Sequence, residues 1–376
     1  MIDPSDLVAW LEENGVSFFA GVPDSLLKEF SAHVMAHVPN DRHLITANEG
    51  NAVAVAMGYH LRTGRTPLVY LQNSGIGNAV NPLLSLADPE VYAIPMVLLV
   101  GWRGQPGAKD EPQHVKQGRV MTAMLNGMDL PWSLLPTEPS DARATVEGAL
   151  RRARQDRSPF VLLAERGTFN SPENAGIRHD KILATREEAV ATVAAAIGAS
   201  VPIVATTGML SRELFEHREH TGLDKSFDFL TIGGMGHASS IALGIALAAP
   251  QDEVWCLDGD GALLMHMGAL AVVGDRGPRR FHHVVFNNGV HDSVGGQPTS
   301  IDAVDLPAVA RNVSYRWARR TAVVEEIPAL IDEMRRNGGP ALLEIRVKPG
   351  SRENIGRPAR TPNDSRAAFM AALGVE

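Results

Sequence analysis

The stretch from Val254 to Asn288 constrains the fold more than any other part of this sequence. It opens with a short apolar run at 254–257, which is typical of a buried strand and is broken by Asp258-Gly-Asp-Gly261. A segment typical of a helix follows at 262–274, and a second β-rich run at 281–286 stops at two asparagines. Such an order of strand, turn, helix and strand builds parallel sheets with right-handed crossovers. We therefore expect both turns at the carboxyl edge of one sheet, where ligands of open α/β sheets bind.

Asp260 and Asn288 should be neighbours at that edge, although 28 positions separate them in the chain. One carboxylate, one amide oxygen and nearby backbone carbonyls suit a hard cation such as Mg²⁺. Phosphate oxygens can fill the remaining octahedral positions, and the amino end of the helix that starts at Gly261 favours an anion. A tight strand-to-helix loop explains a lone Gly-Asp-Gly equally well, so the prediction depends on the pair of motifs.

The paired motifs resemble the signature of the thiamine diphosphate-dependent superfamily that includes pyruvate decarboxylase and acetolactate synthase. This resemblance implies that Asp260, Asn288 and the backbone carbonyl of Val290 bind Mg²⁺, and that thiamine diphosphate is the cofactor. It also implies two flavodoxin-like, doubly wound parallel-sheet domains of the α/β class. One such domain binds the pyrimidine of the cofactor and the other binds the diphosphate.

The rest of the chain fits this plan, because strands alternate with helical patterns in both halves. A loop-like stretch lies at 166–180, and we place a pyrimidine-binding domain at 1–170 and a diphosphate- and Mg²⁺-binding domain at 181–376. The connection is too short for the middle domain that many superfamily members carry. The tail from Pro349 is rich in Pro, Arg and Ser, and we expect it to be surface-bound or mobile.

Composition narrows the class of protein. A chain of 376 residues is long enough for two domains with separate cores. The net charge of −8 argues against non-specific nucleic-acid binding. No segment has the roughly 20 apolar residues of a membrane span, and no basic leader precedes an apolar core. The single cysteine, Cys256, fits a reducing compartment and reads as a small buried residue. We therefore predict a cytoplasmic protein without nucleic-acid or membrane partners.

Glu49 is the predicted catalytic acid of the first domain. It follows a predicted strand at 43–47 and Asn48, a favourable N-cap, and it opens an apolar helix at 49–62. An ordinary first-turn glutamate, stabilised by the helix dipole, is the alternative. In the superfamily a glutamate at the start of this helix activates the cofactor by sharing a proton with its pyrimidine ring. Such a role needs a buried carboxyl with a raised pKa.

Four turns are predicted to hold the cofactor. The turn at 233–236 resembles the one in which a bulky apolar residue wedges the cofactor into its reactive shape. The resemblance makes Met235 that wedge, although core filling is the alternative, and makes the Gly233 carbonyl an acceptor for the 4′-amino group. The expected diphosphate contacts are backbone N–H groups at Gly261, Ala262, Asp292 and Ser293. Further contacts are expected at Gly234 and at the strand-end turn of Thr206, Thr207 and Gly208, with Ser211 as another hydroxyl donor.

Four segments indicate to which branch of the superfamily the sequence is most similar. They lie at 21–27, 102–114, 206–214 and 287–299. Together they resemble phosphonopyruvate decarboxylases, and sulfopyruvate decarboxylases are the nearest alternative. The pyruvate branch is disfavoured because it uses a His-His pair in a loop of the N-terminal domain. Here the only such pair lies in a predicted strand of the other domain. That branch also has a glutamate at the position that Val294 occupies.

An anionic substrate needs cations and hydrogen-bond donors, which an acidic protein must supply locally. The candidates are Arg103, Lys109 and His114 in a long polar loop, and His291 in the turn after the asparagines. Each of them also reads as an ordinary surface charge or loop residue. Asp24, at the end of the first strand, is predicted either to orient substrate or water, or to cap the next helix.

Taken together, these residues and the resemblance predict a Mg²⁺- and thiamine diphosphate-dependent carboxy-lyase that converts 3-phosphonopyruvate to phosphonoacetaldehyde and CO₂. The setting would be phosphonate metabolism, including antibiotic biosynthesis. The alternatives are a sulfopyruvate decarboxylase, another decarboxylase or carboligase of the superfamily, and a non-catalytic thiamine-binding subunit. The joint presence of Glu49, Asp260 and Asn288 argues against the last. The resemblance also implies an obligate homo-oligomer in which active sites lie between subunits.

Overall fold

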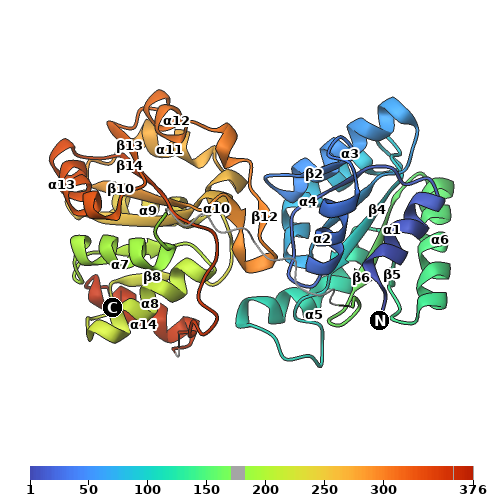
Figure 1. Ribbon diagram of the computed structural model, residues 1–376, viewed down its shortest axis with the longest axis horizontal. Coiled ribbons are helices and arrows are strands. Elements are labelled where there is room, and N and C mark those ends of the chain that lie inside the picture. Colours follow the sequence, from blue (N-terminus) through green and yellow to red (C-terminus); the bar gives the residue numbers. More distant parts are fainter. Residues whose placement is uncertain (171–182, 359, 376) are drawn as a thin grey trace. The chain divides into compact units, whose positions relative to one another are not determined.

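The computed structural model describes residues 1–170, 183–358 and 360–375 (Figure 1). The chain divides into two compact units, residues 1–175 and 176–376, and each contains one six-stranded sheet. Of the predicted linker at 166–180, the part from residue 171 onward lies outside the described residues. None of the helices in the described ranges is long and apolar enough to span a membrane.

The first unit is a parallel sheet in the order β2-β1-β3-β4-β6-β5, with helices on both faces (Figure 1). Its strands are β1 (Phe19–Gly21), β2 (His43–Ile45), β3 (Leu68–Gln72), β4 (Met96–Gly101), β5 (Trp132–Leu134) and β6 (Pro159–Ala164). Its helices are α1 (Pro4–Glu13), α2 (Lys28–His37), α3 (Glu49–Thr63), η1 (Asn73–Gly75), α4 (Ile76–Pro82), η2 (Leu83–Ala87), α5 (Pro112–Gly127) and α6 (Pro139–Asp156).

The core of the first unit follows from the alternation of side chains along its strands. In β3, Leu68 and Tyr70 join the apolar cluster under α1, α2 and α6, whereas Val69 and Leu71 join the cluster under α3, α4 and α5. A strand that is buried on both faces must be apolar throughout, as a doubly wound parallel sheet requires. The continuous apolar runs in the sequence are therefore explained by two helical layers.

The second unit repeats the plan, with the order β13-β14-β10-β9-β7-β8. Its strands are β7 (Ile203–Ala205), β8 (Asp228–Leu230), β9 (Val254–Gly259), β10 (Phe281–Asn287), β13 (Trp317–Thr321) and β14 (Ala341–Arg346), and a separate antiparallel hairpin is formed by β11 (Val290–His291) and β12 (Gln297–Pro298). Its helices are α7 (Arg186–Ile197), α8 (Met209–Thr221), α9 (Ala238–Ala248), α10 (Asp260–Met265), α11 (Ala269–Arg276), η3 (Asp292–Val294), η4 (Ile301–Ala303), α12 (Leu306–Asn312), η5 (Val324–Glu326), α13 (Ile327–Asn337) and α14 (Pro362–Ala372).

The two main sheets have the same strand order. Read from its other edge, the second sheet has the order β8-β7-β9-β10-β14-β13. If the six strands of each main sheet are numbered along the chain, both sheets therefore have the order second, first, third, fourth, sixth, fifth. In both sheets the order reverses between the first and third strands, which is the switch point where doubly wound folds bind ligands. The predicted α/β class with two doubly wound sheets and no middle domain is confirmed.

Three features differ from the sequence-based expectation. The single helix predicted at 262–274 is two helices, α10 and α11, separated at residues 266–268, which include a glycine with poor helix propensity. The tail, which we expected to be surface-bound or mobile, contains a helix that was not predicted: α14 packs against β8, and its buried Phe369 contacts the Phe229 ring at 5.4 Å between centroids. The edge strands β5 and β13 were not predicted, since they lack a continuous apolar run.

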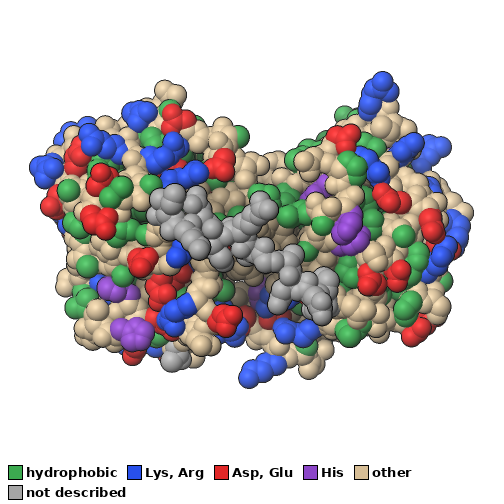
Figure 2. All heavy atoms as spheres, viewed as in Figure 1, with side chains coloured by type: hydrophobic (Ala, Val, Ile, Leu, Met, Phe, Trp, Pro, Cys, Tyr) green, Lys and Arg blue, Asp and Glu red, His purple; other side chains and the backbone are tan. Residues whose placement is uncertain are grey.

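The surface of the molecule carries charges of both signs. On the face that Figure 2 shows, acidic and basic side chains are interspersed. The single cysteine, Cys256, is fully buried in β9, as predicted, and burial raises the pKa of its thiol well above the usual value.

Candidate active site

The turn between β9 and α10 buries the predicted metal ligand Asp260. Its Oδ2 accepts a hydrogen bond of 2.6 Å from the Thr299 hydroxyl, and the backbone N–H groups of Gly261 and Asn288 also donate to the carboxylate. Burial raises the pKa of Asp260 to about 6, and these hydrogen bonds oppose the shift. The structure thus brings Asp260 and Asn288 together, as the parallel order of β9 and β10 predicted.

Asn288 follows β10, and both ends of its amide are engaged. Its Nδ2 donates to Asp292 Oδ2 at 2.7 Å, and its Oδ1 accepts from the backbone N–H of Val290 at 3.1 Å. The preceding Asn287 points elsewhere, since its Nδ2 donates to the buried Glu344 at 2.6 Å. The second asparagine, and not the first, is therefore the one that lies beside Asp260.

The β11–β12 hairpin folds back over the start of α10. A Cβ added at Gly261 would lie 2.9 Å from Cε1 of His291 and 3.3 Å from Thr299, so only glycine fits beneath these residues. His291 is half-buried, and burial lowers its pKa to about 4. Its ring is therefore neutral at pH 7, and it can offer a hydrogen bond but no positive charge.

The turn after β7 reaches the same edge of the second unit. Gly208 has a φ of 101°, and a Cβ added there would lie 3.9 Å from Ser293 Oγ, which makes the two predicted diphosphate turns neighbours. Within the part of the chain that the structure describes, the buried Thr206 Oγ1 has no hydrogen-bond partner. Ser211 is not available as a donor, because its hydroxyl donates to the Thr206 carbonyl at 2.6 Å. Thr207 is half-buried in the same turn.

The Gly233–Gly236 turn lies next to α10. A Cβ added at Gly236 would lie 2.9 Å from the carbonyl oxygen of Ala262 and 2.7 Å from the His266 ring. Gly234 has a φ of 65°, a backbone conformation that favours glycine. Met235 is half-buried, so its side chain is not part of a closed core, which argues against the core-filling alternative.

These residues fit a Mg²⁺–diphosphate group. The donor set includes a buried carboxylate and an amide oxygen, the ligands that Mg²⁺ prefers. A buried hydroxyl without a partner, Thr206 Oγ1, is suited to donate to a phosphate oxygen. Glycines at 208 and 234 leave backbone accessible at strand-end turns, where an anion can be bound by N–H groups.

In the first unit, Glu49 opens α3 directly after its N-cap. Asn48 accepts from the Asn51 backbone N–H at 3.0 Å, as the sequence predicted. The Glu49 side chain is 5% exposed, and its Oε2 accepts from Asn78 Nδ2 at 2.8 Å. Gly75 of η1 lies against the carboxyl group, where any added side chain would clash with it. Glu49 therefore has the burial that a proton-sharing acid requires.

Asp24 is fully buried at the switch point of the first sheet. Its carboxylate accepts from Gln72 Nε2 at 2.6 Å and from the Leu26 N–H at 2.9 Å, and Gly101 packs against it. Burial raises the pKa of Asp24, and these hydrogen bonds oppose the shift. The capping alternative is wrong, because α2 starts later, at Lys28, and has no side-chain cap.

The loop after β4 is shorter and more tightly tied than predicted. The helix α5 starts at Pro112, since proline is favourable at the first helical position, so His114 lies in the helix and not in the loop. Arg103 pairs with Asp110 through two nitrogens and donates to Ser25 Oγ at 2.7 Å. Its hydrogen bonds hold the pKa of Asp110 well below the usual range. The guanidinium of Arg103 is therefore occupied by Asp110 of its own loop and by Ser25 of the segment after β1.

The other two cations of this segment differ in exposure. Lys109 is exposed, and among the described residues it has no ion-pair partner. His114 is half-buried, and burial, with the nearby Arg103, lowers its pKa. Of the three candidates in this segment, Lys109 is the one whose charge is available to a ligand.

Sequence reasoning missed several contacts. Thr299 donates a hydrogen bond to Asp260 because the β11–β12 hairpin brings it close to the start of α10. The Gly-Gly pair at 295–296, between the two strands of this hairpin, is a sequence signal that could have predicted the turn. Asn78 and Gln72, which hold Glu49 and Asp24, had no local signal. The same is true of Arg186, whose contact with Asp292 spans 106 positions.

Comparison with known proteins identifies the family. Residues 5–125 match the model of the thiamine pyrophosphate enzyme N-terminal TPP binding domain, and residues 206–345 match that of the C-terminal TPP binding domain. Thiamine pyrophosphate is a synonym of thiamine diphosphate. The chain belongs to the thiamine diphosphate-dependent 2-oxo acid decarboxylase family.

Three curated relatives extend over both units. The chain is 38% identical to the phosphonopyruvate decarboxylase of Streptomyces viridochromogenes, over 99% of this chain and 95% of the relative. It is 36% identical to the phosphonopyruvate decarboxylase of Streptomyces hygroscopicus, over 98% and 93%. It is 24% identical to the sulfopyruvate decarboxylase of Methanosarcina acetivorans, over 100% and 99%.

Proposed function

We propose that this protein decarboxylates 3-phosphonopyruvate to phosphonoacetaldehyde and CO₂, with thiamine diphosphate and Mg²⁺. The observation that carries the proposal is the sequence identity of 36–38% to two phosphonopyruvate decarboxylases along nearly the whole chain. A sulfopyruvate decarboxylase matches equally completely but at 24% identity, which makes sulfopyruvate the second candidate substrate. Both substrates are 2-oxo acids with an anionic head group.

In this proposal each unit has its own role. Residues 1–170 would bind the pyrimidine and residues 181–376 the diphosphate. Asp260, the Asn288 amide oxygen and the Val290 carbonyl would hold Mg²⁺, and the Thr206 hydroxyl would donate to the diphosphate. Thiamine diphosphate, when bound, supplies a nucleophilic carbon and accepts the electron pair that remains as CO₂ leaves. Glu49 would hold the shared proton, because it is buried and kept in place by Asn78.

The head group would be recognised by charge. A phosphonate gains roughly 1.5–3 kcal/mol from each hydrogen bond to a charged group, and pyruvate lacks those bonds. Lys109 is favoured over Arg103 for this role, since Asp110 and Ser25 already occupy the Arg103 guanidinium. His291 would act as a neutral donor, because burial lowers its pKa to about 4.

The protein would act as a homo-oligomer in which the pyrimidine unit of one subunit faces the diphosphate unit of another. Corresponding helices of the two units support this proposal, because both expose apolar residues. On α3, Val55 and Leu61 are exposed, and on α9, Ile241 and Leu247 are exposed. Exposed apolar residues grouped on a helix are typical of association surfaces. Light scattering tests this directly, and a fully active monomer would contradict it.

The test of function is CO₂ release by the purified protein from phosphonopyruvate, sulfopyruvate and pyruvate, each with and without thiamine diphosphate and Mg²⁺. We expect the highest kcat/KM for phosphonopyruvate and none without cofactor. Faster turnover of sulfopyruvate would favour the second candidate. Acyloin products would indicate a carboligase, and the absence of turnover with all three acids would refute the proposal.

A further inference from the structure

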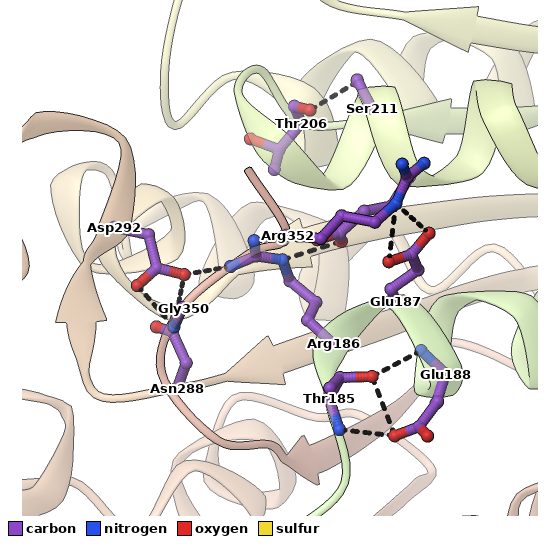
Figure 3. A network of polar contacts seen from close by, with 11 residues as sticks. Thr185, Arg186, Glu187, Glu188, Thr206, Ser211, Asn288, Asp292, Gly350 and Arg352 are labelled. Carbon is purple, nitrogen blue, oxygen red and sulfur yellow. Dashed lines mark hydrogen bonds and ion pairs between the residues drawn. The ribbon is translucent and has the colours of Figure 1, made fainter. Parts of the chain in front are cut away.

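A chain of buried polar contacts ends at the predicted metal ligand Asn288 (Figure 3). In Figure 3, Asp292 lies between Arg186 and Asn288, and the backbone of Gly350 approaches its other oxygen. We propose that Asp292, held by Arg186, is a positioning residue that fixes the Asn288 amide with its oxygen directed to the metal. This inference rests on the Mg²⁺ site of the proposed function.

The chemistry of an amide makes such a residue necessary. An asparagine amide has nearly the same shape in two orientations, but only its oxygen can bind Mg²⁺. In the structure, Nδ2 donates to Asp292 Oδ2 at 2.7 Å, and Oδ1 accepts from the Val290 N–H at 3.1 Å. A flipped amide would place oxygen against carboxylate and N–H against N–H. The carboxylate of Asp292, which only accepts, therefore excludes the orientation that cannot bind the metal.

Asp292 is itself held from two other directions. Arg186 NH1 donates to its Oδ2 at 2.7 Å, and the Gly350 N–H donates to its Oδ1 at 3.0 Å. Arg186 cannot turn away, because its Nε and NH2 donate to Glu213 at 2.8 and 3.0 Å. Arg186 is 7% exposed and Glu213 is 2% exposed, so water does not readily replace these bonds. The Asp292 carboxylate is thus fixed by three donors.

The geometry also separates orientation from charge. Because Oδ2 alone accepts from both Asn288 and Arg186, an Asp292→Asn side chain can place its amide oxygen there and keep both bonds. It would lose only the bond to Gly350, where its NH₂ group would face a donor. Asp292→Ala would lose all three. An effect of the negative charge on the metal would weaken both variants equally.

The experiment is calorimetric titration of Mg²⁺ into the metal-stripped full-length protein with saturating thiamine diphosphate. We expect Asp292→Ala to raise the Kd for Mg²⁺ by about 10–100-fold, the usual effect of losing a residue that orients a metal ligand. Asp292→Asn should stay within about threefold of the wild type by the same measure, since it keeps the orienting bond. Arg352→Ala is the matched control, because Arg352 pairs with Glu187 and Glu216 near this network without contacting Asp292.

The outcomes are distinct. Wild-type Mg²⁺ affinity in Asp292→Ala, or equal losses in Asp292→Ala and Asp292→Asn, would overturn the positioning role. Thermal unfolding without Mg²⁺ shows whether Asp292→Ala folds. If it does not fold, the test uses a folded Arg186→Lys variant, for which we expect weakened Mg²⁺ binding. Wild-type affinity in that variant would also overturn the role. A wild-type protein that binds no Mg²⁺ would instead refute the metal site itself.

Discussion

The two units share one strand order but carry different chemistry at matching positions of their sheets. After the second strand, the first unit has Glu49 and the second unit has the Gly233–Gly236 turn. After the fourth strand, the first unit has Arg103 and the second unit has Asn288. At these positions the first unit thus has ionisable side chains, whereas the second unit has a predicted metal ligand, Asn288, and a glycine-rich turn.

This difference shows that the fold fixes the place of a site and the loops fix its chemistry. Each unit buries a carboxyl group at the carboxyl edge of its sheet, and burial raises the pKa of Asp24 in the first unit and of Asp260 in the second. Asp24 is held by Gln72 and backbone N–H groups in the described structure. Asp260 lies beside Asn288, the other predicted metal ligand, and accepts a hydrogen bond from its backbone N–H. The predictions below test whether the two units divide their work in this way.

The largest effect should come from the second unit. Asp260→Ala removes the only charged ligand of the proposed metal site, so we expect activity to fall to background and the Mg²⁺ Kd to rise more than about 100-fold. Calorimetric titration of Mg²⁺ measures the affinity. The exposed Asp275 on α11 provides a control as Asp275→Ala. Normal thiamine diphosphate binding by Asp260→Ala in Mg²⁺ buffer would mean that the motif is misassigned.

Glu49→Gln should separate activation from binding in the first unit. A neutral amide cannot share the proton, so exchange of the cofactor C2 proton should slow about 10²–10⁴-fold, while cofactor affinity remains. NMR detection of proton–deuterium exchange is the measurement, and Glu90→Gln, at an exposed loop position, is the control. An unchanged exchange rate in Glu49→Gln would remove Glu49 from this role.

Lys109→Ala should have a smaller effect that is confined to the substrate. Loss of one charge-assisted bond should raise the KM for phosphonopyruvate about tenfold, with C2 proton exchange unchanged. Steady-state kinetics with phosphonopyruvate provides the KM and kcat. If both constants match the wild type, Arg103, His114 and His291 remain as candidates and the Lys109 contact is wrong.

The last prediction concerns how the stability of the second unit depends on pH. His282 is buried against the Trp255 ring, and burial lowers its pKa to about 4. The unfolded chain takes up this proton below about pH 6.5, whereas the folded protein does so only near pH 4. Stability from this group is therefore complete above the unfolded pKa and is lost as pH falls through this window.

The measurement is urea unfolding at pH 7 and pH 5 for the wild type and His282→Phe. The phenyl ring keeps the stacking but cannot titrate, so His282→Phe should lose roughly 2 kcal/mol less than the wild type between these pH values. The exposed His220 supplies the control variant His220→Phe. Equal losses in wild type and His282→Phe would show that His282 does not titrate on unfolding.

Most of the fold was predictable because its signals are local. Apolar runs marked the central strands, and Asn48 marked the start of α3. Edge strands such as β13, whose apolar run is interrupted by two adjacent exposed arginines, gave no such signal. The tail helix was missed because one buried aromatic residue, Phe369, anchors it to a strand far away in the sequence.

The candidate site was predictable to the extent that motifs sit at strand ends. Asp260 and Asn288 could be paired because parallel strands bring their ends together. The occupation of Arg103 by Asp110 could not be predicted, since it depends on how the loop closes. The role of Arg186 could not be predicted either, because its partner Asp292 is 106 positions away.

Each of the four apolar clusters lies within one unit of the chain. A coding sequence interrupted between residues 170 and 183 would therefore yield two polypeptides, each with a complete sheet and a closed interior. If the gene were split at this position, we expect each product to keep its own apolar core. The same is expected if one half were exchanged with that of a relative. A substitution in the apolar core of one unit would therefore leave the core packing of the other unit unchanged.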